Sequence, residues 1–106
     1  MHESCGIFGI YSPVGNVSRL TFFALFALQH RGQESSGIAT TDGNGIFSHS
    51  GMGLASHVFD EAALSRLPGT IAIGHNRYST TGSSRLTNAQ PIVLEYAGEK
   101  IALGHN

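Results

Sequence analysis

The stretch Cys5-Gly6-Ile7-Phe8-Gly9-Ile10-Tyr11 lies near the start of the chain and contains its only cysteine. Glycines alternate with apolar and aromatic residues, and apolar side chains occupy both parities, so we expect a buried strand here. A free cysteine in such a strand is most often a small buried hydrophobe. Removal of Met1 to Ser4 would instead make Cys5 an N-terminal residue with a thiol nucleophile. Its own α-amine, with an ordinary pKa of about 7.7 to 8.0, would then be the base.

Composition narrows the classes of function. The chain has 106 residues, enough for one domain at most. A net charge of -1 with six Lys and Arg residues does not supply the basic face that nucleic acid requires, so we expect no nucleic-acid partner. The longest apolar stretch, 20–28, is far shorter than the ~20 residues of a membrane span. No signal-peptide pattern is present and one cysteine excludes an intrachain disulfide, so we predict a cytoplasmic protein without a membrane partner.

Periodicity and turn signals predict alternating helices and strands. Asn16 is expected to cap a helix that is apolar nearly all round and therefore packed on two sides, with Gly32 ending it. In the strand 70–78, His75 and Arg77 share one face with two isoleucines by the two-residue period, which puts Arg77 at the rim of a pocket. The expected elements are a helix from Val17 to about His30, a hairpin of strands 36–41 and 46–50 joined by Asp42-Gly43-Asn44-Gly45, a helix from His57 to Leu67, a strand from Thr70 to Tyr78, a loop over 79–90, and a hairpin over 91–96 and 101–103 that turns at Gly98.

Two dense polar blocks, 29–38 and 74–84, interrupt these apolar elements. The first reads in isolation as a solvated helix end in which Arg31 and Glu34 form a pair. The second reads in isolation as a strand leading into a loop, with Arg77 in a structural ion pair. Either block alone is weak support for a site.

Taken with Cys5 and the final His105-Asn106, the two blocks resemble, in order and spacing, the class II glutamine amidotransferases. The resemblance covers 5–106 and is nearest to the branch that transfers ammonia to phosphoribosyl pyrophosphate. Three features indicate that branch: Gln33-Glu34-Ser35 after Arg31-Gly32, Tyr78 after Arg77, and the segment 88–91. The aminosugar synthases have Tyr-Asp and a tryptophan at the first two of these places, and the asparagine synthetases resemble the blocks less.

The resemblance implies an α+β fold of the N-terminal-nucleophile hydrolase type. Such a fold is a four-layer sandwich, with two antiparallel sheets between helical layers. Residues 1–4 would be a short propeptide and 5–106 the incomplete N-terminal part of the glutaminase domain. Because the chain stops directly after an apolar run, at Gly104-His105-Asn106, we interpret it as a fragment. A phosphoribosyltransferase domain would lie outside it.

The resemblance also implies an enzyme that hydrolyses glutamine through a cysteine thioester and makes 5-phosphoribosylamine for purine synthesis. Asn106 would stabilise the oxyanion with a following glycine, Gly32 would let the backbone approach Cys5, and Arg77 would bind the substrate α-carboxylate. Alone, the segment is expected to be inactive. The implied site residues are Cys5, Asn106 and Gly32 for catalysis, and Arg77, Tyr78 and Thr80 for substrate binding.

No cofactor is expected in this segment. The six histidines lack the spacing of a zinc site, so we predict no metal site here. The resemblance implies Mg²⁺ in the phosphoribosyltransferase domain and leaves open an iron–sulfur cluster outside this segment. The implied partners are glutamine, phosphoribosyl pyrophosphate and further copies of the full-length protein in a homo-oligomer. Two alternatives stay open: the glutaminase domain of another class II amidotransferase, for aminosugar or asparagine synthesis, and a noncatalytic binding domain in which Cys5 is never exposed.

Overall fold

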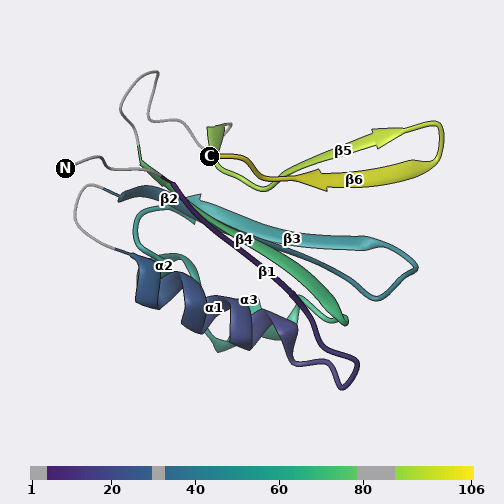
Figure 1. Ribbon diagram of the computed structural model, residues 1–106, viewed down its shortest axis with the longest axis horizontal. Coiled ribbons are helices and arrows are strands. Elements are labelled where there is room, and N and C mark those ends of the chain that lie inside the picture. The colour runs from purple at the N-terminus through teal and green to yellow at the C-terminus, as the bar shows by residue number, and fades with distance from the viewer. Residues whose placement is uncertain (1–4, 30–32, 79–87) are drawn as a thin grey trace.

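A computed structural model describes residues 5–29, 33–78 and 88–106. A four-stranded antiparallel sheet has the order β1-β4-β2-β3, and β5 and β6 form a separate antiparallel ribbon. Figure 1 shows the helices against one face of the four-stranded sheet and the ribbon over the other. The described elements are β1 (Gly6–Tyr11), α1 (Val17–Leu28), β2 (Gln33–Thr41), β3 (Ile46–Met52), α2 (Ala55–Val58), α3 (Glu61–Ser65), β4 (Ile71–Tyr78), β5 (Ile92–Tyr96) and β6 (Glu99–Leu103).

The contact between β4 and α1 organises the core. A Cβ on Gly74 would lie 2.6 Å from Cγ2 of Thr21, so only glycine lets α1 come this close to the strand. The buried Asn76 donates to the backbone oxygen of Leu25 at 2.9 Å and accepts from Oγ of Ser36 at 2.8 Å. Alternate residues of β4 therefore face α1, and His75 and Arg77 lie on the opposite face, which is the side of the sheet on which the ribbon lies (Figure 1). The hydrophobic core on the α1 side comprises Leu25, Ile38, Ala55, Phe59, Ala63, Leu64 and Leu67.

The first strand is present, but the expectation that it is buried is wrong. β1 pairs on one side with β4 and forms an edge of the sheet. Its residues alternate between partly buried and exposed, and Ile7 and Tyr11 are exposed. In β1, apolar residues at both odd and even positions therefore do not indicate a strand that is buried on both faces.

The first helix differs from its prediction at both ends and on one face. It ends at Leu28 instead of near His30, and the Asn16 side chain makes no capping hydrogen bond, because that residue is left-handed with a φ of 66°. The helix packs on the sheet along one side only. Its other side leaves apolar residues exposed, including Phe23 and Phe26.

The helix expected from His57 to Leu67 is two short helices, α2 and α3. The break occurs because Phe59 and Asp60 are extended, and Oδ1 of Asp60 caps α3 by accepting a hydrogen bond from the backbone N–H of Ala63 at 2.8 Å. Both predicted hairpins and the predicted strand 70–78, which contains Arg77, are confirmed. The predicted antiparallel α+β character is likewise confirmed.

Candidate active site

One end of the four-stranded sheet brings together residues that are far apart in sequence. Gly6 of β1 pairs with Asn76 of β4. Cys5, which immediately precedes β1, and Arg77 of β4 are the next residues on either side of this pair. On the other side of β4, Ser35 of β2 pairs with Arg77. The start of β1, the end of β4 and the start of β2 therefore lie together at one end of the sheet.

The final residues of the chain lie at the same end of the sheet. The backbone N–H of Cys5 donates to Oδ1 of Asn106 at 3.1 Å, across 101 residues of sequence, and Figure 1 shows the C-terminal end beside the start of β1. Because a backbone N–H can only donate, the amide oxygen of Asn106 faces Cys5 and its NH₂ group points elsewhere. Cys5 is half-buried and its thiol is free of a disulfide. A nucleophile and an amide donor are thus neighbours.

Arg77 is held by two contacts. Its Nε donates to Oε2 of Glu34 at 3.0 Å and its Nη1 donates to the backbone oxygen of Asn88 at 3.2 Å. The side chains of Arg77 and Glu34 are 19% and 6% exposed, so the pair is largely shielded from water. Glu34 sits where the pairing of β2 is irregular, between Gln33 and Ser35. Among the residues that the structure describes, none accepts a hydrogen bond from Nη2.

His75 bonds to the segment that carries Asn106. Its Nε2 lies 2.8 Å from the backbone oxygen of His105, and Oε1 of Gln90 accepts from the backbone N–H of His105 at 2.7 Å. Burial lowers the pKa of His75, its bond to the His105 backbone raises it, and the charges of His105 and Arg77 lower it further. The net result is a lowered pKa, so the imidazole is neutral at pH 7. Because a carbonyl can only accept, the proton must be on Nε2.

The remaining predicted site residues are less informative. Tyr78 is buried at the end of β4, where it pairs with Gln33, and the two-residue period assigns it to the face opposite Arg77. Gly32 and Thr80 lie outside the described residues, as do Met1 to Ser4.

Sequence reasoning missed the links that join these residues. From the sequence, Glu34 is a partner of Arg31 and part of the branch-specific triplet 33–35, and Gln90 belongs to a loop and to the branch-specific segment 88–91. Neither residue is linked to Arg77 or His105 by these patterns. The available signal was the shared face of His75 and Arg77, which pointed to a common polar neighbourhood.

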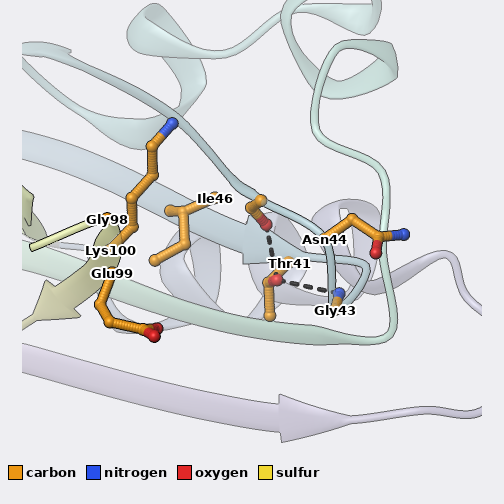
Figure 2. Close-up of a pocket in the computed structure, with 8 residues that line it drawn as sticks. Thr41, Gly43, Asn44, Ile46, Gly98, Glu99 and Lys100 are labelled. Atoms are coloured by element: carbon orange, nitrogen blue, oxygen red, sulfur yellow. Dashed lines mark hydrogen bonds between the residues drawn. The ribbon is translucent and has the colours of Figure 1, made fainter.

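A pocket lies at the opposite end of the sheet, between the β2–β3 turn and the β5–β6 turn (Figure 2). Thr41 closes the first turn, since its Oγ1 donates to the oxygen of Gly45 and accepts from the N–H of Gly43. Lys100 and Glu99 extend along the other wall. The pocket is remote from Cys5, so we do not assign the chemistry to it. Among the described residues, no group of three or more His, Cys, Asp or Glu side chains could hold a metal ion.

Relatives of known identity match nearly the whole chain. It is 57% identical over 104 residues to the amidophosphoribosyltransferase of Synechocystis. This match covers 98% of this chain and 21% of that protein. It is 50% identical over 106 residues to amidophosphoribosyltransferase 3, chloroplastic, of Arabidopsis thaliana, covering 100% of this chain and 20% of that protein. No protein-family model matches. The chain thus spans about a fifth of the length of these curated relatives.

A solved structure has the same fold. The glutamine phosphoribosylpyrophosphate amidotransferase from B. subtilis, complexed with ADP and GMP, superposes with a TM-score of 0.81 at 40% identity. The match covers 94% of this chain and 21% of that chain. The chain is therefore homologous to the N-terminal segment of amidophosphoribosyltransferases.

No helix in the described ranges is long and apolar enough to span a membrane, and the cytoplasmic location stays a prediction.

Proposed function

We propose that this chain, as the N-terminal segment of an amidophosphoribosyltransferase, provides the glutamine-hydrolysing site of that enzyme. The observation that carries the proposal is the 3.1 Å contact between the nitrogen of Cys5 and Oδ1 of Asn106. It brings the chain's only thiol beside a side chain amide that has two N–H donors left.

The reaction is a nucleophilic substitution in two steps. After removal of residues 1–4, the α-amine of Cys5 takes the thiol proton while sulfur attacks the side chain carbonyl carbon of glutamine. The carbon–nitrogen bond breaks, and the nitrogen leaves as ammonia with that proton. Water then attacks the thioester while the α-amine takes one of its protons; the carbon–sulfur bond breaks, the sulfur receives that proton to restore the thiol, and glutamate leaves. The NH₂ group of Asn106 stabilises the oxyanion in both steps, together with a backbone N–H.

Substrate binding is assigned to Arg77. Glu34 and the Asn88 carbonyl fix its guanidinium and leave Nη2 to bind the α-carboxylate of glutamine. Gly32 and Thr80 complete the proposal, Gly32 near the thiol and Thr80 along the substrate. The Tyr78 side chain is not assigned to the substrate, because the strand period puts it on the face opposite Arg77.

The proposal extends to the whole protein. Further chain completes a four-layer sandwich of the N-terminal-nucleophile type, of which the described residues form one helical layer, one sheet and a ribbon. A phosphoribosyltransferase domain with Mg²⁺ uses the ammonia to convert phosphoribosyl pyrophosphate to 5-phosphoribosylamine. The full-length protein is a homo-oligomer.

The test uses the full-length protein that contains this chain. Its intact mass should show the loss of residues 1–4, and a chloroketone analogue of glutamine should label the Cys5 thiol. Cys5→Ala should abolish glutamine-dependent product formation and leave ammonia-dependent formation intact, because only the first site needs the thiol. Glutamine-dependent turnover by Cys5→Ala, or an active enzyme that still begins at Met1, would refute the proposal.

A further inference from the structure

We propose that His75 and Gln90 are positioning residues that hold Asn106 against Cys5 by clamping both backbone polar groups of His105. The inference rests on the proposed function, in which Asn106 stabilises the oxyanion. It adds two residues that do not touch the reacting atoms.

The clamp consists of two hydrogen bonds to the backbone of one residue, His105. Nε2 of His75 donates to the oxygen of His105 at 2.8 Å, and Oε1 of Gln90 accepts from the nitrogen of His105 at 2.7 Å. Both side chains are buried, whereas His105 and Asn106 are exposed. The exposed segment therefore takes its orientation from buried groups. Asn106 follows immediately, so a rotation at His105 would move its amide.

Both anchors are themselves fixed by the sheet. His75 lies in β4 between Ile7 of β1 and Gly37 of β2. A Cβ on Gly37 would lie 2.1 Å from the backbone oxygen of Gln90, so the glycine allows the chain at residue 90 to lie directly on β2. Gln90 is thereby held over the same strand that borders His75.

The chemistry of His75 suits a fixed donor. A carbonyl acceptor requires the proton on Nε2, and among the described residues Nδ1 has no hydrogen-bond partner. Burial lowers the pKa of His75 and therefore keeps the ring neutral in the neutral pH range. The ring has one N–H, and the clamp uses it.

The experiment measures steady-state kinetics of the full-length enzyme with glutamine and with ammonia. His75→Leu removes the donor, His75→Gln keeps a donor at the Nε2 position, and Gln90→Met removes the acceptor at similar volume. The matched control is His49→Leu, because His49 makes the same kind of bond, from Nε2 to the oxygen of Val58 at 3.0 Å, in β3.

We expect His75→Leu and Gln90→Met to lower kcat for glutamine about ten- to a hundredfold, since a misplaced oxyanion donor acts on the transition state. The KM for glutamine should change by less than about threefold, because Arg77 is untouched. His75→Gln should restore most of kcat, and His49→Leu should leave it unchanged. Ammonia-dependent activity should be the same in all four variants.

Two results would overturn the clamp. One is an unchanged kcat for glutamine in both His75→Leu and Gln90→Met. The other is an equal fall of the glutamine and ammonia activities in both, which would make the contacts merely structural. Cys5→Ala run in parallel separates this failure from that of the proposed function. If Cys5→Ala loses glutamine-dependent activity while the clamp variants keep it, only the clamp is wrong.

Discussion

In the proposed function, Arg77 combines a structural and a substrate-binding role in one side chain. Its bond to Glu34 is the structural ion pair that the sequence allowed for it, and the same bond fixes the plane of the guanidinium. A held guanidinium loses less conformational entropy when it binds a carboxylate than a mobile one would. We therefore interpret the ion pair as support for the binding role.

Arg77→Lys keeps the charge but removes the planar fork and the Nε donor to Glu34. We expect glutamine use to weaken by ~1 to 3 kcal/mol in kcat/KM, the scale of charge-assisted hydrogen bonds. Ammonia-dependent activity is the control and should not change. Unchanged glutamine kinetics in Arg77→Lys would show that Arg77 is structural alone.

The buried His75 predicts a pH dependence of stability. Its pKa is lower in the folded protein than the ordinary 6.5, so the unfolded chain binds the extra proton first as pH falls. Its contribution is therefore complete above about pH 6.5 and is lost below it, at up to about 1.4 kcal/mol per pH unit. Urea unfolding of wild type and His75→Gln at several pH values measures this. A difference between the two that is constant from pH 7.5 to 5.5 would contradict it.

At the scale of elements, the close approach of α1 to β4 depends on Gly74. Gly74→Ala would place a methyl group against Thr21 and Leu25, and such overpacking costs about 1 to 3 kcal/mol. Gly9→Ala is the matched control, since a Cβ there meets nothing nearer than 4.0 Å. Urea unfolding should show a clear loss for Gly74→Ala and little for Gly9→Ala. Equal stabilities would mean that α1 shifts without cost.

Elements with strong local signals could be predicted from the sequence. The turn Asp42-Gly43-Asn44-Gly45 determines its hairpin, and Pro68-Gly69 separates the preceding helix from β4. Burial could not be predicted in the same way, because the edge position of β1 depends on the order of strands that are distant in sequence. The capping role of Asp60 was a local signal that the helical pattern around it obscured.

The same distinction applies to the candidate site. Cys5, Arg77 and Asn106 could be proposed because they stand in motifs that resemble a known family. The contacts of His105 with His75 and Gln90 join residues 30 and 15 positions apart. No periodicity indicates such contacts, because the sheet and the returning segment create them.

At the scale of the whole molecule, many large apolar side chains of the described residues are exposed. The exposed side of α1 and both faces of the β5–β6 ribbon contribute. A two-stranded ribbon is marginally stable without further packing. The exposed large apolar residues there are Leu20, Phe23, Phe26, Leu28, Ile92, Val93, Leu94, Tyr96, Ile101 and Leu103.

Residues 1–106 expressed alone should therefore self-associate. Light scattering after size-exclusion chromatography should show species larger than the 11.2 kDa monomer, and a dye that binds apolar surface should fluoresce more than with the full-length protein. Replacing Phe23 and Phe26 with Glu should reduce both signals. A stable monomer without dye binding would contradict the prediction.

In the proposed function, the pairing of β1 with β4 has one more consequence: it determines which length of substrate side chain fits the site. Because Gly6 pairs with Asn76, the sulfur-bearing residue and Arg77 lie at a separation set by backbone hydrogen bonds, which a substrate cannot adjust. An amino acid whose carboxylate is bound by Arg77 therefore presents its amide to the thiol only at one side chain length. Asparagine is one methylene shorter, and a misplacement of about 1 Å at a reacting centre costs on the order of a hundredfold in rate. Substrate selection would then be a property of strand register, and kcat/KM for asparagine against glutamine measures how rigidly the sheet enforces it.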